Sequence, residues 1–292
     1  MSSFLTYLIT GISLGSIYAL IALGYTMVYG IAKMLNFAHG DVIMIGGYVV
    51  FIAISTLYCP VWLAIAAGIL SCTLLGVVIE KVAYKPLRTA PPLAVLITAI
   101  GVSYLLQNSA LLIFGSQARS FTSVVPKFSL PIGNVNVTGE TIVTIVVSVL
   151  IMILLTLFVN RTKSGKAMLA VSEDKGAAQL MGINVNATIT LTFAIGSALA
   201  GIASVLLCST YPQISPYTGA MPGIKAFTAA VFGGIGSIPG AMIGGIVLGV
   251  IENLSKAYIS SELSDAIVFA VLIVILLVKP TGIMGKKINE KV

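Results

Sequence analysis

The chain has 292 residues, of which 58% are hydrophobic and 9% are charged, and its mean hydropathy is +1.08. Because soluble domains carry about 25% charged residues, this composition excludes a soluble globular protein and indicates an integral membrane protein. The formal net charge of +7 comes from basic residues gathered in a few polar stretches, so membrane lipid is an expected partner and nucleic acid is not.

Several uncharged apolar runs are long enough to cross a membrane as helices. A hydrocarbon core needs about 20 helical residues, and none of the runs alternates apolar with polar residues as a half-buried strand would. We therefore predict an all-α, polytopic bundle in one domain, residues 1–292, with about seven to nine membrane segments that include short or discontinuous helices. The runs are 4–32, 42–79, 93–118, 141–160, 188–224, 226–251 and 266–278.

The first expected helix is Phe4 to Tyr29, which lacks the basic start of a cleaved signal sequence. Gly11, Gly15 and Ala19 lie four residues apart along it, a spacing that lets a second helix approach its backbone closely. This stripe therefore predicts helix packing rather than chemistry.

The apolar run then breaks at the sequence NFAHGD, which contains the single histidine of the chain. Polar groups at membrane depth are costly, so such a cluster either lies at an interface or lines an aqueous path. One interpretation is an ordinary turn between two helices. The other makes Asn36, His39 and Asp41 residues of a translocation path or gate. A metal site is disfavoured, because one histidine and one aspartate supply too few ligands.

Two helices, Val42 to Tyr58 and Val61 to Ile79, are expected next, separated by a Cys-Pro break. A basic loop, Glu80 to Pro92, follows them, and Leu93 to Phe114 then crosses the membrane again. Residues 115–140 form the expected external loop, in which the alternating VPKFSLPIGNVNVTG is typical of a small hairpin.

After a helix over Thr141 to Val159, the segment 160–187 is the one long charged interlude and must lie in water. Basic residues mark the cytoplasmic side of a membrane protein, so this segment, the 80–92 loop and the C-terminal tail are expected there. Three helices before the 80–92 loop would put the N-terminus outside, unless NFAHGD interrupts one discontinuous helix. The basic residues are Lys81, Lys85, Arg88, Arg161, Lys163, Lys166, Lys175, Lys279, Lys286, Lys287 and Lys291.

The second half of the 160–187 segment is predicted to form a short helix. Ser172 is the expected N-cap, and Glu173 and Asp174 complement the positive end of the helix dipole. Gly182 can adopt the left-handed closing conformation, and Ile183 follows where a closing hydrophobic contact is expected.

This short helix carries a small apolar face that the segment itself cannot cover. The face consists of Ala177, Ala178, Leu180 and Met181. We expect it to pack on a partner, either the membrane bundle or another protein.

A helix over Thr188 to Thr210 follows, and a final one is expected over Leu263 to Val278. If that last helix ends inside, Ile224 to Asn253 must return to the side where it began, as two short crossings or as a re-entrant pair of half-helices. At its centre, GGIGSIPG lacks the lysine and hydroxyl of a phosphate-binding loop. We expect its regular glycines to be packing or hinge positions: Gly236, Gly240 and Gly244.

No catalytic, metal-binding or nucleotide-binding constellation is found in the sequence, and the three cysteines fit small core residues. An ion-coupled carrier places carboxylates near the middle of the membrane. Asp41, Glu252 and Asp265 are instead expected near segment ends. We therefore predict a permeation pathway without its own energy source, driven through the 160–187 segment.

Several stretches resemble the H-type permease subunit of bacterial branched-chain amino acid ABC importers, and the resemblance runs nearly end to end. A related urea importer permease shares much of the first stretch. The stretches are GISLGSIYALIALGYTMVYGIAKMLNFAHGD, VAYKPLR, AVSEDKGAAQLMGINV, KAFTAAVFGGIGSIPGAMIGG and LLVKPTGIMG.

The resemblance implies a multi-pass protein of the bacterial plasma membrane that works with a second permease, two ATPase subunits and an external binding protein for leucine, isoleucine or valine. ATP would be used by the partner subunits, and no cofactor would be bound by this chain. The mechanism implied is alternating access around a central path.

The 160–187 segment resembles the coupling element that docks in a cleft of the ATPase. Ala177, Ala178 and Gly182 match its Ala-Ala-x-x-x-Gly core, whereas Gly176 stands where many importers carry glutamate. The implied coupling residues are Ser172, Glu173, Asp174, Lys175, Ala177, Ala178, Leu180, Gly182 and Ile183.

Alternatives at this stage are a urea or amide importer permease, an ATP-independent carrier or channel, and a scaffold subunit. For the charged segment, the alternative is an amphipathic helix resting on the membrane surface.

Overall fold

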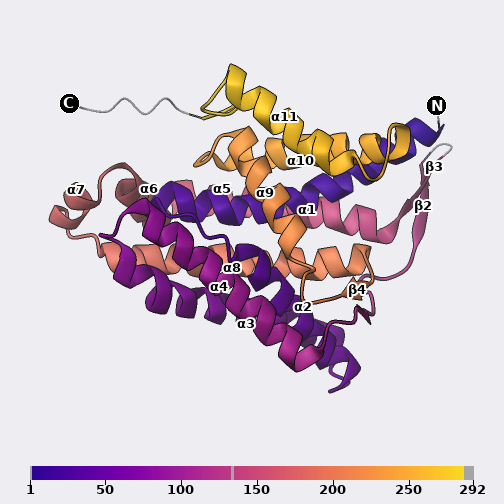
Figure 1. Cartoon of the computed structure of the whole chain (residues 1–292), viewed down its shortest axis with the longest axis horizontal. Helices are drawn as coiled ribbons and strands as arrows, with labels where there is room; N and C mark the ends of the chain where they lie inside the picture. Colours follow the sequence, from indigo (N-terminus) through magenta and orange to yellow (C-terminus); the bar gives the residue numbers. More distant parts are fainter. Residues whose placement is uncertain (1, 133–134, 286–292) are drawn as a thin grey trace.

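A computed structural model describes residues 2–132 and 135–285 and shows a bundle of helices that run mostly along one long axis (Figure 1). Lys286, Lys287 and Lys291, expected in the cytoplasmic tail, lie outside the described residues. The helices are α1 (Ser2–Ala32), α2 (His39–Ser55), α3 (Val61–Ile79), α4 (Pro92–Phe114), α5 (Gly139–Arg161), α6 (Lys163–Glu173), α7 (Lys175–Leu180), α8 (Val185–Thr210), α9 (Ala220–Gly233), α10 (Ile238–Tyr258) and α11 (Ser264–Val278).

Four short strands lie together at one end of the bundle, which we call the hairpin end (Figure 1). Strands β2 (Ser129–Ile132) and β3 (Val135–Thr138) form an antiparallel hairpin, which confirms the sequence prediction. Strand β1 (Arg119–Ser120) pairs antiparallel with β4 (Gln213–Ile214) and so ties the two loops of this end together.

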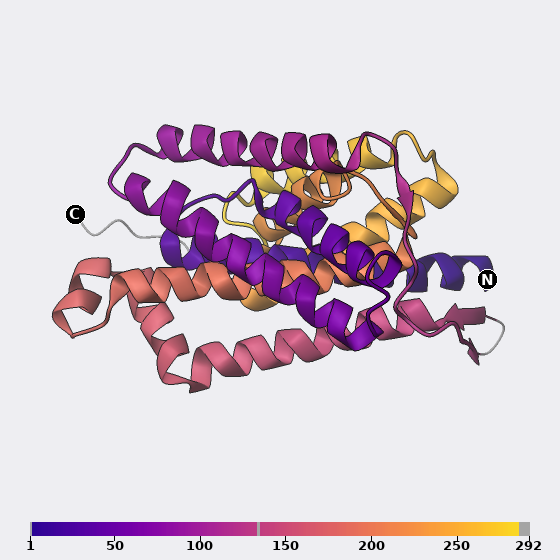
Figure 2. The ribbon, with the colours of Figure 1, turned by 90° about the horizontal axis from the view of Figure 1, so that it is seen from below.

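The opposite end of the bundle carries α6 and α7, and we call it the α7 end (Figure 2). The N-terminal end of α1 lies at the hairpin end, as counting three helices before the 80–92 loop predicts. Within the described residues, six helices are long and apolar enough to span a membrane, and α2 and α11 are shorter apolar helices. These features confirm the predicted all-α membrane bundle.

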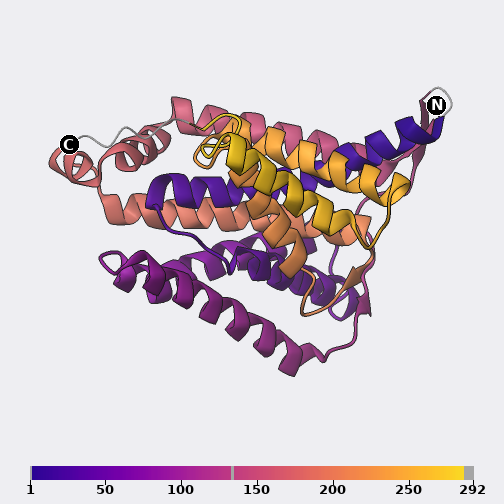
Figure 3. The ribbon, with the colours of Figure 1, turned by 45° about the horizontal axis from the view of Figure 1, so that its top comes forward.

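Helices α1 and α8 form the centre of the bundle, whereas α4 and α5 are peripheral. In the most apolar 18-residue stretch of α8, 72% of the residues are buried, whereas in that of α4 only 11% are buried. The stripe on α1 packs on α10, because a Cβ added at Gly15 would lie 2.6 Å from the Cα of Ile246. Helix α11 in turn lies over α9 and α10 (Figure 3).

Two helices begin inside the bundle rather than at its ends (Figures 1 and 2). The chain leaves α1 at Ala32, re-enters the bundle and starts α2 at His39. Helix α9 likewise starts at depth after β4, and its first turn meets that of α2. A Cβ added at Gly219 would lie 1.8 Å from the carbonyl oxygen of Gly40, so the two backbones touch there. The NFAHGD break is therefore a buried helix junction and not an ordinary surface turn.

Neither arrangement predicted for Ile224 to Asn253 is found in the structure. Helix α9 has 14 residues, about 21 Å at 1.5 Å per residue, which is too short to span a hydrocarbon core. Helix α10 has 21 residues and is long enough. The region therefore consists of one half-helix, α9, followed by one full crossing, α10. The sequence predicts either two short crossings or two half-helices.

The GGIGSIPG turn, residues 233–240, joins α9 to α10, and two of the three predicted packing glycines in this region lie against backbone. A Cβ added at Gly240 would lie 2.4 Å from the oxygen of Gly233, and one at Gly244 would lie 2.2 Å from that of Ala229. Gly236 has a φ of +93°, a conformation that favours glycine.

The predicted basic loop Glu80 to Pro92 is wrong in its first half. A π-helical turn, η1 (Glu80–Tyr84), and a 3₁₀ turn, η2 (Lys85–Leu87), continue α3 instead. Charged residues there indicated a loop, but Glu80 is fully buried, with Arg88 and Thr190 as its partners.

Candidate functional site

The 160–187 segment begins with a helix that the sequence analysis did not predict, α6. Helix α6 starts where the hydroxyl of Thr162 accepts a hydrogen bond from the backbone N–H of Gly165 at 3.0 Å. Met168 and Val171 face inward and are buried. The threonine cap at the end of a long apolar run was the signal that would have located this helix.

The N-cap predicted for the second helix is wrong. Asp174 caps α7 by accepting a hydrogen bond from the N–H of Ala177 at 2.9 Å, whereas Ser172 lies inside α6 and donates to the carbonyl of Leu169 at 2.6 Å. Aspartate is as good an N-cap as serine, and placing it there lets α6 extend through Glu173.

The predicted end of α7 is confirmed. Gly182 has a φ of +82°, and its N–H donates to the carbonyl of Gln179 at 3.0 Å. The N–H of Ile183 donates to the carbonyl of Ala178 at 3.0 Å. These two bonds form a Schellman motif, and Ile183 packs against the hydrophobic core.

The apolar face of α7 is divided between two surroundings. Ala178 is 4% exposed and packs on the bundle, whereas Leu180 and Met181 are 90% and 83% exposed. Ala177 is exposed as well. A tip that exposes two large apolar side chains at one end of the molecule is suited to a protein partner.

Helix α7 is connected directly to the end of α1. The Lys175 ammonium donates to the carbonyl of Ala32, the last residue of α1, at 3.0 Å. A cation at a helix C-terminus is favourable. Burial, together with the charges of Arg88 and Lys33, lowers the pKa of Lys175 below its ordinary value. This hydrogen bond joins α7 to the chain four residues before NFAHGD.

A cavity of about 550 Å³ lies beside α7, between it, the start of α8 and the η2 turn. It is lined by basic and amide residues and by the residues of the α7–α8 connection. The polar residues that line it include Arg88, Lys175, Gln179, Asn184 and Asn186.

The three predicted path residues are all buried, between 1% and 2% exposed. The Asn36 carboxamide oxygen accepts a hydrogen bond from the Tyr84 hydroxyl at 3.0 Å. Asp41 accepts one from Gln107 of α4 at 2.9 Å. The small cavity beside Asn36 has no room for a water molecule. The structure places all three residues, buried, at the α1–α2 junction, where no space for a water molecule remains beside Asn36.

His39 occupies a confined position in the same junction. Its ring lies against Tyr25 with centroids 4.8 Å apart, and its Nε2 atom would be 2.4 Å from a Cβ added at Gly24. The histidine side chain therefore packs α2 onto α1. Within residues 2–132 and 135–285, no group of three His, Cys, Asp or Glu side chains could hold a metal ion.

Glu252 lies in the last two turns of α10, near a segment end as expected, but it is not solvated there. It lies in α10, is 1% exposed and forms ion pairs with Lys225 of α9 and Lys256. Lys225 also pairs with Asp265 at 2.6 Å. Sequence analysis missed this cluster, although a lysine inside an apolar run was a signal, because a buried charge needs a partner.

Glu80 is a second buried carboxylate, and Arg88 is its ionic partner. Thr190 of α8 also donates to it at 2.8 Å. We predict that Arg88→Met destabilises the fold by about 3–5 kcal/mol, because an unpaired charge is left buried. Thermal unfolding of the purified protein measures this loss. Adding Glu80→Gln should restore part of it, and Arg161→Met, at an exposed position, is the control. A melting temperature for Arg88→Met equal to that of the control would contradict the prediction.

Comparison with known proteins identifies the family of this bundle. A family model described as branched-chain amino acid transport system / permease component matches residues 7–276. The chain is 48% identical to the high-affinity branched-chain amino acid transport system permease protein LivH of Salmonella typhimurium, over 99% of this chain and 98% of that protein. It is 46% identical to BraD of Pseudomonas aeruginosa, which bears the same description, over the same shares.

A more distant relative is the probable branched-chain amino acid transport permease protein LivH of Methanocaldococcus jannaschii. It is 30% identical, over 92% of this chain and 89% of that protein. A family model that covers most of the chain, together with relatives matched over almost their whole length, shows that this multi-pass membrane protein belongs to the permease component family of branched-chain amino acid transport systems.

Proposed function

We propose that this chain is the membrane-spanning permease subunit of an ATP-driven importer for leucine, isoleucine and valine in the bacterial plasma membrane. The observation that carries the proposal is the 48% identity over nearly the full length to a permease described as transporting branched-chain amino acids. In this proposal the hairpin end faces outward and the α7 end faces the cytoplasm.

Energy for transport would come from separate ATPase subunits, which bind and hydrolyse the ATP, while this chain binds no cofactor. Support comes from the exposed tip of α7, where Leu180 and Met181 lack apolar neighbours that would cover them. Docking of this tip in a cleft of the ATPase buries both side chains. A second permease would complete the translocation path, and an external binding protein would deliver the substrate.

Coupling would proceed from α7 to the junction at NFAHGD. Closure of the ATPase pair moves α7, and the Lys175 contact carries that movement to the carboxyl end of α1. The connection 33–38 then shifts the first turn of α2 against that of α9. Asn36, His39 and Asp41 would act as gate residues at this junction, which is an alternating-access mechanism.

Reconstitution into liposomes tests the proposed function. The chain is co-purified with its second permease and the ATPase subunits, and the binding protein is added outside. We expect ATP-dependent uptake of labelled leucine and none without ATP. Uptake of labelled urea in place of leucine would assign the chain to a urea or amide importer. Transport by the isolated chain without nucleotide would instead show a carrier or channel.

A further inference from the structure

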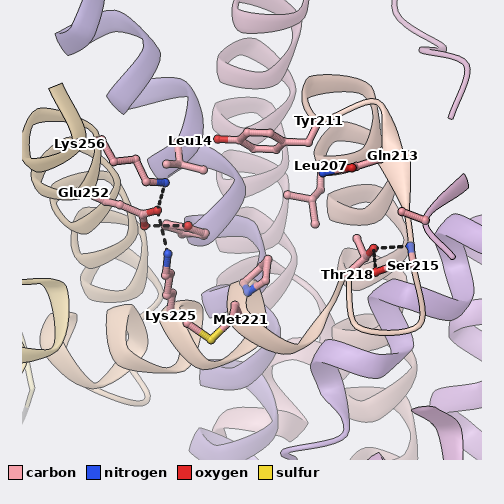
Figure 4. Close-up of a pocket in the computed structure, with 13 residues that line it drawn as sticks. Leu14, Leu207, Tyr211, Gln213, Ser215, Thr218, Met221, Lys225, Glu252 and Lys256 are labelled. Carbon is pink, nitrogen blue, oxygen red and sulfur yellow. Dashed lines mark hydrogen bonds and ion pairs between the residues drawn. The ribbon is translucent and has the colours of Figure 1, made fainter. Parts of the chain in front are cut away.

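A cavity of about 390 Å³ opens at the hairpin end of the bundle, between α1, α8, α9 and α10 (Figure 4). Its volume lies within the range of small-molecule pockets, about 300–1,000 Å³. Charged side chains gather on the side formed by α9 and α10, and apolar side chains contribute the rest of the wall. The charged residues are Lys225, Glu252 and Lys256, and the apolar ones include Leu14, Leu207 and Met221.

The charges that face this cavity form one balanced cluster. One carboxylate oxygen of Glu252 accepts from Lys225 at 2.8 Å and from Lys256 at 2.5 Å. The other oxygen accepts from the Tyr18 hydroxyl at 2.8 Å. Because Asp265 pairs with Lys225 from the other side, the cluster contains two cations and two anions. Its net charge is zero.

Such a cluster is not explained by stability. Removing two charges from water costs about as much as their attraction returns, so a buried ion pair is often no more stable than an apolar substitute. Ionisable groups inside membrane bundles are rare and usually mark a ligand or ion pathway. Here the charges border a cavity instead of packed side chains, and Lys256 is 37% exposed. A ligand that enters the cavity can therefore reach the Lys256 ammonium directly, whereas Lys225 and Glu252 line the wall behind it and are 7% and 1% exposed.

We propose that this cavity is a binding site for a zwitterionic amino acid with an apolar side chain, an assignment that rests on the proposed function. The ammonium of Lys256, with that of Lys225 behind it, binds the ligand carboxylate. Glu252 accepts a hydrogen bond from the ligand ammonium. The side chain of the ligand packs on the apolar wall of the cavity, and a neutral zwitterion leaves the balanced cluster neutral.

The cavity lies next to the buried junction between α2 and α9, so a ligand could bind there before it passes the junction. Thr218 lines the cavity, and the next residue, Gly219, packs against Gly40 at the start of α2. A ligand bound in the cavity is thus one residue from the helix junction that must open for passage.

Direct binding tests the site. The complete complex in lipid nanodiscs, without the binding protein, is titrated with labelled leucine, and unlabelled analogues compete. Leucinol lacks the carboxylate and 4-methylpentanoate lacks the ammonium, so each should compete at least tenfold more weakly than leucine. Equal competition by leucinol would overturn the role of the lysines, and equal competition by 4-methylpentanoate would overturn that of Glu252.

Two variants locate the binding. Lys256→Gln removes the more exposed cation and should weaken leucine binding at least tenfold, while Lys127→Gln, at an exposed position in the external loop, should leave it unchanged. Met221→Trp fills the cavity from a residue that is 42% exposed and keeps the ion pairs, so it should also block binding. Unaltered binding by either cavity variant would overturn the proposal.

The uptake assay separates this inference from the proposed function. If the complex takes up leucine with ATP but does not bind it without the binding protein, the cavity assignment falls and the importer assignment stands. If leucine is neither taken up nor bound, both fall.

Discussion

Leu180→Asp is expected to reduce ATP-dependent uptake by at least tenfold while leaving the membrane bundle folded. The side chain is 90% exposed in the isolated chain, so its replacement costs the fold little. Once docked, however, the same position would be buried in the ATPase. Loss of a buried interface anchor typically costs 2 kcal/mol or more, and each 1.4 kcal/mol is tenfold in affinity.

Co-purification of the ATPase subunits and uptake of labelled leucine measure this effect together. Leu57→Asp is the matched control, because Leu57 is 64% exposed and lies in the connection between α2 and α3, outside the 160–187 segment. Normal uptake by Leu180→Asp would contradict the docking assignment. If both variants lost uptake equally, the loss would come from introducing a charge at any exposed apolar position. That result would also contradict the docking assignment.

Leu180 is the better position for this test because it points away from the bundle, whereas Ala178 packs on it. A charge at Ala178 would be placed against the bundle, since that residue is 4% exposed, and would disturb the fold along with any docking. Proline at Gly182 would meet the same difficulty, because proline cannot adopt a φ of +82°. The outward-facing leucine tests docking alone.

Gly219→Ala is expected to lower the melting temperature of the protein by at least about 5 °C and to abolish uptake. The added Cβ would lie 1.8 Å from the carbonyl oxygen of Gly40, so the starts of α2 and α9 must separate. Overpacking in a core costs about 1–3 kcal/mol and sometimes more, and for a chain of this size about 1 kcal/mol shifts the melting temperature by roughly 2–4 °C. Both contacting groups are backbone, so the cost should lie at the upper end.

Thermal unfolding in detergent and the uptake assay provide the measurements. Gly101→Ala is the matched control, because a Cβ added there in α4 meets nothing within 4 Å. Alanine also favours a helix over glycine by about 1 kcal/mol, so the control should be as stable as the original protein or slightly more so. A Gly219→Ala protein with unchanged melting temperature would show that the two helix starts are not in close contact.

The sequence alone located features that depend on neighbouring residues. The helix expected over Val61 to Ile79 coincides with α3, the alternating loop forms the β2–β3 hairpin, and Gly182 has the predicted left-handed conformation. Periodicity, caps and turn residues act over a few positions, so a local reading can detect them. The same reading failed at α6, because two adjoining caps, Thr162 and Asp174, divide a charged segment that looked like one loop and one helix.

Only the tertiary structure decided which distant groups meet. Tyr18 reaches Glu252 across 234 residues, Lys175 reaches Ala32 across 143, and Glu80 is buried beside Thr190 across 110. A charged residue in a sequence looks like a loop or an interface, because isolated charges are excluded from the membrane interior. Once the fold supplies a counter-charge, the same residue can be buried, and no local pattern records where that partner lies. The bundle could thus be predicted from composition, whereas its buried helix junction and its charged cavity depend on how the helices pack.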